Sequence, residues 1–325
     1  MLSGRYLLSG VGVLGLLLGA SACGGAPTPT AASARPHQSA SVTGTALKSS
    51  SQGSSVLSHA NSTPPPTKES SNTASPPVAT AMAPLVQPSP AKPLTALVIG
   101  DSLGEDLQYG MADVAGTGGS LRIIEAAYGS SGLVNQQYYN WPKVLASDLR
   151  RYHPQLVYVL FGGNDARSFD QGARYIPFGS ALWKKVYGAR VNTIISEVLR
   201  AKAHLIWVGL PVMSPSSVLS NTRMQALNAL YRAEVQKHPA QAAFIATWSL
   251  FRTPRGGFAE YMVDSAGVRV MVRDPDGVHI APPAGQELIA SYVLRQTEKA
   301  ERISLCVRGS NLWQQYSLPH CAAKR

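Results

Sequence analysis

Three short segments of the chain contain the residue types needed for nucleophilic catalysis. They are Gly-Asp-Ser-Leu at 100–103, Gly-Gly-Asn-Asp at 162–165 and Asp-Gly-Val-His at 276–279. A serine hydroxyl is a poor nucleophile until a base removes its proton. Histidine, with an ordinary pKa of about 6.5, is suited to that task. Ser102 and His279 are therefore the candidate nucleophile and base.

Two further side chains complete this chemistry. Asp276 precedes His279 by three residues, so one loop can orient the imidazole ring with a carboxylate. Asn164 can offer its amide to a developing oxyanion, beside the backbone N–H of Ser102. Together the four residues predict acyl transfer through a serine nucleophile.

The elements that must position these residues alternate along the chain. Short apolar runs predict strands at 94–100, 121–124, 156–161, 204–209 and 243–246. Apolar residues at helical spacing predict helices at 141–152, 181–201, 222–237 and 284–299. Such alternation is typical of a parallel sheet covered on both faces. Ligands of these sheets bind at the carboxyl ends of the strands, where the three segments are expected to meet.

Composition excludes several classes of protein. Only 14% of the 325 residues are charged, and the chain has three cysteines. These values exclude a disulfide scaffold, a coiled coil and a polytopic membrane protein. The lysines and arginines are scattered despite a net charge of +11, so no nucleic-acid partner is predicted.

A long segment before the first strand is predicted to be disordered. Of the 70 residues at 24–93, 46 are Ser, Thr, Pro or Ala and none is Phe, Trp or Tyr. Such a composition buries too little apolar surface to offset the entropy of ordering. We interpret it as a tether, which leaves 94–325 to form one core.

The first 23 residues have the pattern of an export signal. Arg5 precedes an uncharged run at 6–19 that is shorter than a membrane-spanning helix. Ala-Ser-Ala-Cys at 20–23 then resembles the lipobox of bacterial lipoproteins. That resemblance implies lipidation of Cys23 and an exported protein anchored to the membrane of the cell envelope. The alternative is plain cleavage, with a spare thiol.

The two other cysteines, Cys306 and Cys321, lie fifteen positions apart. In an exported protein such a pair predicts a disulfide, which contributes roughly 3 kcal/mol by restricting the unfolded chain. It would pin a C-terminal extension at 301–325, which contains Trp313. The alternative is two free thiols.

Taken together and in this order, the three catalytic segments resemble those of the SGNH hydrolases, also called GDSL-type esterases. The resemblance covers 94–300 and implies a flavodoxin-like three-layer α/β/α sandwich with a parallel sheet of about five strands. It implies Ser102 as nucleophile, Asp276 and His279 as the remaining triad members, and Asn164 as an oxyanion donor. The middle of the chain is similar to a branch of exported bacterial members.

The same family takes a further oxyanion donor, a glycine N–H, from the loop after the second strand. Gly129 and Gly132 both lie in that loop, and the sequence leaves the choice open. The asparagine that usually precedes this glycine is absent, and Glu125 occupies the region instead.

Two other catalytic designs fit less well. Residues 100–104 also match the Gly-x-Ser-x-Gly elbow of α/β-hydrolases, but that serine follows a strand deep in the chain rather than the first one. Asp274, Asp276 and His279 form a small acidic group without a fourth ligand, so no metal site is predicted. No cofactor is predicted either, because the Gly-x-Gly-x-x-Gly at 10–15 has no strand before it and lies within the signal.

The expected function is hydrolysis of an O-acyl ester, acetyl or short acyl, on a carbohydrate of the envelope. An O-acyltransferase with the same triad is the first alternative, and a non-catalytic envelope-binding module is the second. Tyr138, Tyr139 and Trp141 are either a wall that stacks on sugars or core packing. Arg167 is either a contact for an anionic substrate group or a solvated side chain.

Overall fold

The structure is a computed structural model that describes residues 83–322. The predicted signal peptide, the predicted lipidation site at Cys23 and most of the predicted tether lie outside the described residues. Within the described part, no helix is both long and apolar enough to cross a bilayer.

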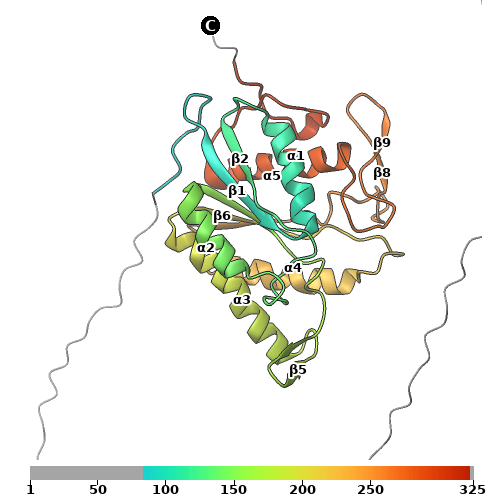
Figure 1. Cartoon of the computed structure of the whole chain (residues 1–325). Coiled ribbons are helices and arrows are strands. Elements are labelled where there is room, and N and C mark those ends of the chain that lie inside the picture. The colour runs from blue at the N-terminus through green and yellow to red at the C-terminus, as the bar shows by residue number, and fades with distance from the viewer. Residues whose placement is uncertain (1–82, 323–325) are drawn as a thin grey trace, which may run out of the picture. The chain divides into compact units, whose positions relative to one another are not determined.

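A five-stranded parallel sheet forms the centre of the domain (Figure 1). Its strands are β1 (Leu94–Gly100), β2 (Leu121–Glu125), β3 (Leu156–Leu160), β6 (His204–Val208) and β7 (Ala242–Ile245). Their order is β2-β1-β3-β6-β7, the order of a flavodoxin-like sheet. The predicted fold class is therefore confirmed. β1, β3 and β6 are buried along their whole length, which explains their unbroken apolar sequences.

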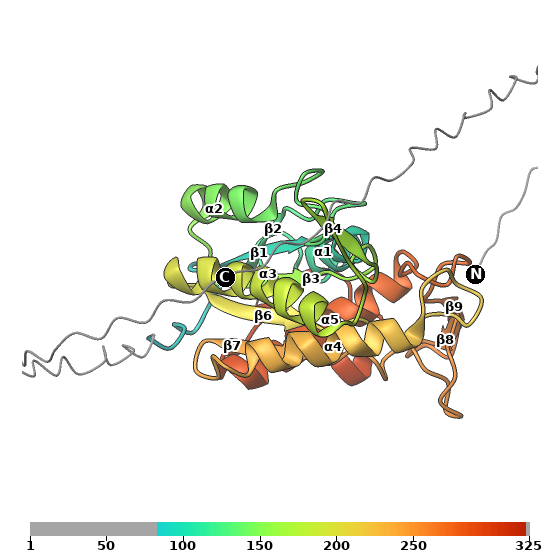
Figure 2. The ribbon, with the colours of Figure 1, turned by 90° about the horizontal axis from the view of Figure 1, so that it is seen from below.

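Five helices cover the sheet (Figures 1 and 2). They are α1 (Ser102–Ala115), α2 (Trp141–Tyr152), α3 (Ala181–Arg200), α4 (Asn221–Val235) and α5 (Ala284–Glu301). α1 packs against α5, whereas α3 packs between α2 and α4. The result is three layers, with the sheet between two groups of helices.

Helix α1 is absent from the helices predicted above, although it carries Ser102. Its buried apolar residues follow helical spacing: Leu103, Leu107, Met111 and Val114. Glycine lowers helix propensity, and Gly104 and Gly110 interrupt this pattern. At Gly110 close packing requires the glycine, because a Cβ there would lie 2.1 Å from the carbonyl oxygen of Gln286 in α5.

Two hairpins and a short 3-10 helix were also not predicted. They are β4 (Phe169–Gln171) with β5 (Arg174–Ile176), β8 (Tyr261–Val263) with β9 (Arg269–Met271), and η1 (Gln314–Tyr316). Each strand has three residues, which is too short for a two-residue period to stand out.

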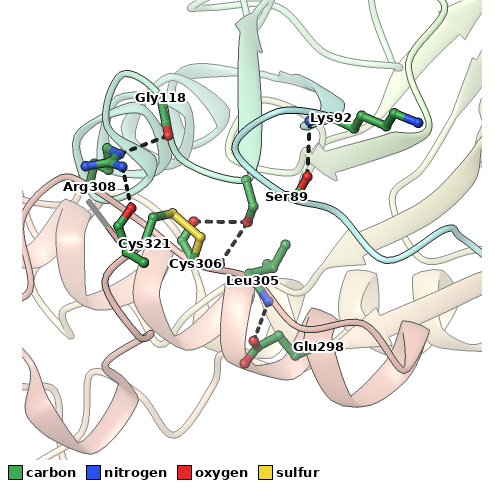
Figure 3. The surroundings of a disulfide bond; sticks show 10 residues. Ser89, Lys92, Gly118, Glu298, Leu305, Cys306, Arg308 and Cys321 are labelled. Atoms are coloured by element: carbon green, nitrogen blue, oxygen red, sulfur yellow. Dashed lines mark hydrogen bonds between the residues drawn. A yellow bond between two sulfur atoms is a disulfide. The ribbon is translucent and has the colours of Figure 1, made fainter. Parts of the chain in front are cut away.

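The C-terminal extension is part of the fold. A disulfide joins Cys306 to Cys321, as predicted (Figure 3). Cys306 exchanges hydrogen bonds with Ser120, just before β2, and Arg308 donates to the carbonyl of Gly118. Trp313 is fully buried, and its Nε1–H donates to the carbonyl of Ala284 at the start of α5.

The last part of the predicted tether also lies against the domain. The carbonyl oxygen of Ala83 is 3.3 Å from Nε2 of His204, the first residue of β6. The Gln87 side chain donates to the carbonyl of Arg302 and accepts from the N–H of Ser304. The folded unit therefore begins before 94, and the chain joins it at the amino-terminal edge of the sheet.

Candidate active site

Ser102 lies where β1 ends and α1 begins. Asp101 caps the helix, because its Oδ1 accepts the N–H of Leu103 at 3.1 Å. Its Oδ2 accepts the N–H of Gly162 at the end of β3, at 2.9 Å, and so links the two strand ends. Complete burial of this carboxyl raises its pKa to about 7. As the first residue of the helix, Ser102 keeps an N–H without an intrahelical partner.

The structure brings the three predicted triad residues into one hydrogen-bonded chain. The Ser102 Oγ is 2.9 Å from Nε2 of His279, although 177 positions separate them. Nδ1 of His279 is 2.5 Å from Oδ2 of Asp276. With its proton on Nδ1, the imidazole donates to Asp276 and accepts from the serine hydroxyl. This is the arrangement in which histidine can act as a general base.

Charge states in the triad follow from these contacts. Burial by itself raises the pKa of Asp276, but hydrogen bonds from the N–H groups of Val278 and His279 hold that pKa below its ordinary value. Burial by itself lowers the pKa of His279, but the Asp276 carboxylate raises it above the ordinary value. Asp276 is therefore ionised at neutral pH and favours the imidazolium that forms when His279 accepts a proton.

Two buried charged groups hold the histidine loop from behind. The first is Asp106 on α1, whose Oδ2 accepts the N–H of Ile280 at 2.9 Å and whose Oδ1 accepts from Gln286 at 3.1 Å. Burial raises the pKa of Asp106 to about 6. Because Ile280 follows His279 directly, this carboxyl ties the loop to the helix that carries Ser102.

The second group is Arg273, which has no exposed surface. Its guanidinium donates to the carbonyls of His279 at 3.2 Å and Val278 at 2.7 Å. The guanidinium carbon is 5.1 Å from the ring centre of Phe251 and 5.0 Å from that of Phe258. Burial lowers the pKa of Arg273 to about 10, so the group stays charged at neutral pH.

The candidate oxyanion donors lie in or against the loop that follows β2. The Asn164 side chain donates to the carbonyl of Ser131 at 2.9 Å, which places the amide against this loop. Gly129 donates its N–H to Oε1 of Glu105 at 2.8 Å, so that group is already engaged. Within residues 83–322, the N–H of Gly132 has no hydrogen-bond partner. Of the two glycines left open by the sequence, the geometry favours Gly132.

Asp165, next to Asn164, holds this loop in place. Its buried carboxylate accepts the N–H groups of Leu133 at 3.0 Å and Val134 at 2.8 Å. Arg190 of α3 donates to the carbonyls of the same two residues. A Cβ on Gly132 would lie 2.4 Å from Oδ1 of Asp165, so only glycine fits there.

Sequence reasoning did not assign a role to Asp106, Asp165 or Arg273. Asp165 belongs to the Gly-Gly-Asn-Asp segment at 162–165, but the sequence does not show which groups its carboxylate binds. Arg273 directly follows the apolar residues 270–272, which is the one local signal that its side chain is buried.

The three aromatic residues for which a sugar-stacking wall and core packing were both left open divide into two groups. Trp141 is fully buried, and its Nε1–H donates to Oγ of Ser131 at 3.0 Å, so it belongs to the core packing. Tyr138 is exposed, and Tyr139 stacks on Tyr128. Arg167 is exposed, as in its solvated alternative. Across the described range, no group of three or more His, Cys, Asp or Glu side chains is placed to hold a metal ion.

Residues 95–296 match the model of a family described as "Protein of unknown function (DUF459)". The chain belongs to this family. The match runs from the second residue of β1 through β9 and into α5, so it includes every candidate catalytic residue of this DUF459 chain. No curated protein matches the chain.

Several solved structures are similar to this DUF459 chain. A GDSL-like lipase from Bacteroides thetaiotaomicron is 15% identical, with a TM-score of 0.46, over 66% of this chain and 93% of that one. A psychrotrophic esterase from Pseudoalteromonas sp. is 13% identical, with a TM-score of 0.42, over 63% and 97%. A catalytic mutant of an acetylxylan esterase from Geobacillus stearothermophilus is 12% identical, with a TM-score of 0.42, over 62% and 93%. The geometry of the site, rather than these similarities, carries the argument for a reaction.

Proposed function

We propose that this protein is a serine esterase of the SGNH type that hydrolyses an O-acyl ester. The observation that carries the proposal is the continuous hydrogen-bonded chain from the Ser102 hydroxyl through His279 to Asp276. It lies at the carboxyl edge of a parallel sheet, where ligands of such folds bind. The substrate we propose is an acetyl or short-acyl ester of an envelope carbohydrate.

The reaction proceeds in two halves. The Ser102 Oγ attacks the ester carbonyl while its proton passes to Nε2 of His279, and the carbonyl π pair becomes the oxyanion. The N–H groups of Ser102 and Gly132 and the amide of Asn164 stabilise that charge. The tetrahedral intermediate then expels the alcohol, which takes the proton from His279, and an acyl-enzyme remains.

Water completes the cycle. It gives a proton to His279 and attacks the acyl carbon, and the second tetrahedral intermediate collapses with transfer of that proton back to the Ser102 oxygen. The acid is released and the serine is restored. Asp276 stays ionised throughout, because its part is to hold the imidazole ring and stabilise the imidazolium.

We also propose that Cys23 is lipidated and anchors the exported protein to the cell envelope. The chain joins the domain near His204, at the edge of the sheet opposite Ser102. That geometry leaves the candidate active site facing away from the point where the tether attaches. We expect Cys23→Ser to abolish incorporation of labelled palmitate, and persistent labelling would contradict the anchor.

The proposed reaction is tested with residues 24–325, beside Ser102→Ala and His279→Ala. Release of p-nitrophenol from p-nitrophenyl acetate is expected in the wild type and absent in both variants. A series of longer p-nitrophenyl esters then defines the acyl length that the site accepts. Equal release from all three proteins would exclude the triad. Acyl groups recovered on an added sugar, with little free acid, would assign the same triad to transfer.

A further inference from the structure

A cluster of exposed tyrosines lies in the loop that follows β2, which also carries Gly132. Tyr128 and Tyr138 keep 45% and 54% of their surface exposed, and their ring centres are 6.3 Å apart. Tyr139 stacks against Tyr128, with ring centres 4.4 Å apart and planes inclined by 14°. Tyr139 in turn contacts the buried Trp141 at 4.8 Å. Tyr128 and Tyr138, hereafter the tyrosine platform, are therefore supported by the core and still present their surfaces to solvent.

The platform is tied to the strand end that carries the candidate nucleophile. The N–H of Tyr128 donates to the carbonyl of Gly100 at 2.9 Å, two residues before Ser102. The next residue, Gly129, donates to Glu105 in the first turn of the same helix as Ser102. The backbone of Tyr128 is therefore fixed beside the end of β1 that leads into Ser102.

A polar cavity is lined by the residues that directly precede Tyr138 in the same loop. The turn that carries Tyr138 begins at Asn135, whose side chain and carbonyl both accept the N–H of Tyr138. Asn135 also lines a cavity of about 770 Å³ between residues 134–137 and 167–172. The volume lies within the range of about 300–1,000 Å³ typical of ligand pockets.

The side chains of this cavity favour an uncharged, hydroxyl-rich ligand. Asn135, Gln136 and Gln137 supply amide donors and acceptors along one wall. The exposed charges on the other wall, Arg167 and Asp170, are of opposite sign. The remaining cation, Arg190, already donates to the carbonyls of the oxyanion loop.

We propose that the tyrosine platform and this cavity form a binding site for a neutral oligosaccharide, namely the glycan whose ester the site hydrolyses. This inference rests on the proposed function only where it identifies the bound glycan as the esterified substrate. A sugar ring has an apolar C–H face and a rim of hydroxyl groups. The tyrosine surfaces match the face, and the amide wall of the cavity matches the rim.

Binding is tested in the Ser102→Ala protein, residues 24–325, so that no substrate is consumed. The probes are xylotetraose and chitotetraose, each partially O-acetylated, and the readout is calorimetry with saturation-transfer NMR. We expect one of them to bind, and Tyr128→Ala and Tyr138→Ala each to weaken it about tenfold, as for aromatic residues that dominate an interface. Tyr138→Phe keeps the ring and is expected to restore binding. Gln137→Ala tests the cavity and is also expected to weaken binding.

Tyr261→Ala is the matched control, since Tyr261 is an exposed tyrosine outside the platform, on the β8–β9 hairpin. Its binding is expected to equal that of the Ser102→Ala parent. Failure of both probes to bind, or binding that survives Tyr128→Ala and Tyr138→Ala unchanged, would overturn the glycan site.

The two proposals fail separately. Wild-type hydrolysis of p-nitrophenyl acetate without glycan binding removes the glycan site and keeps the esterase. Glycan binding that depends on the platform, without ester hydrolysis by the wild type, supports the glycan site and turns the protein into a binding module.

Discussion

His279 is the residue whose protonation decides whether the proposed reaction starts. Its imidazole must be neutral to accept the Ser102 proton, and Asp276 raises its pKa above the ordinary value. Asp276 thereby makes His279 a stronger base. It also raises the pH above which His279 is neutral and can accept the serine proton. Both effects come from one hydrogen bond of 2.5 Å.

The pH dependence of activity follows from this contact. We expect kcat/KM to rise with pH as His279 loses its proton, with a midpoint above the ordinary histidine value of about 6.5. Asp276→Asn is expected to lower that midpoint and to reduce kcat by roughly 10³–10⁴, because the amide no longer favours the required tautomer and charge. A midpoint that stays the same in Asp276→Asn would show that the carboxylate does not set the basicity.

Asn164 is expected to act on the transition state rather than on substrate binding. Asn164→Ala removes one proposed oxyanion donor, so kcat should fall by about 10²–10³ while KM changes little. The comparison is kinetic, with Gln236→Ala, at the exposed C-terminal end of α4, as an amide substitution outside both proposed sites. A change in KM alone would place Asn164 in ground-state binding.

Loops, rather than strands, carry His279 and the candidate oxyanion glycine, and buried or half-buried charged side chains hold those loops in place. Asp106 and Arg273 hold the residues around His279, whereas Asp165 and Arg190 hold those after Gly132. Each of these groups satisfies backbone donors or acceptors that would otherwise be unpaired inside the protein.

Arg273→Met tests this arrangement as a positioning effect. The substitution leaves the buried carbonyls of Val212 and Val278 without their donor, which costs about 1–3 kcal/mol of unfolding free energy. The carbonyl of His279 loses one donor and keeps the N–H of Asp274. A displacement of His279 by about 1 Å is enough to lower kcat about 10²-fold. We expect a lower Tm, a lower kcat with little change in KM, and a shifted pH midpoint.

Arg273→Lys is the matched variant, since it keeps the charge but loses the fork of donors. We expect it to recover part of the stability and of kcat. A kcat equal to that of the wild type in Arg273→Met, with only Tm reduced, would limit Arg273 to a structural role.

The candidate active site and the segment that leads into the domain lie at opposite ends of the central strands. The candidate catalytic residues lie at the carboxyl edge of the sheet, and residues 83–93 and the disulfide lie at the amino-terminal side of β1 and β2 (Figures 1 and 3). The C-terminal extension also covers the end of α1, because Arg308, Gly309 and Ser310 donate their N–H groups to its last turn. The extension thus stabilises the helix that begins with Ser102.

Removing the disulfide is expected to change stability and leave the reaction intact. The double variant Cys306→Ala with Cys321→Ala should lose roughly 3 kcal/mol of unfolding free energy, by the chain-entropy argument. For a domain of this size, that loss lowers Tm by roughly 6–12 °C. Thermal unfolding and p-nitrophenyl acetate hydrolysis at 25 °C separate the two effects. Loss of activity at a temperature where the variant is folded would show that the extension also shapes the site.

The local pattern of the sequence was enough to predict the strands of the sheet and to select the candidate catalytic residues. The five strands were predicted close to their observed bounds, since buried parallel strands are short apolar runs. Ser102, Asp276 and His279 were selected by residue type and order along the chain. Cys306 and Cys321 were paired by counting, because the predicted lipidation of Cys23 leaves only that pair.

Only the tertiary structure decided what depends on contacts between distant segments. The hydrogen bond from Gly129 to Glu105 decided in favour of Gly132, and the burial of Trp141 decided between its two alternatives in favour of core packing. The packing of α1 on α5 depends on their close approach at Gly110, which no local periodicity reveals. The roles of Asp106 and Arg273 likewise became visible only in the fold. Spacing along a chain encodes local conformation, whereas burial and hydrogen-bond partners are set by which segments pack together.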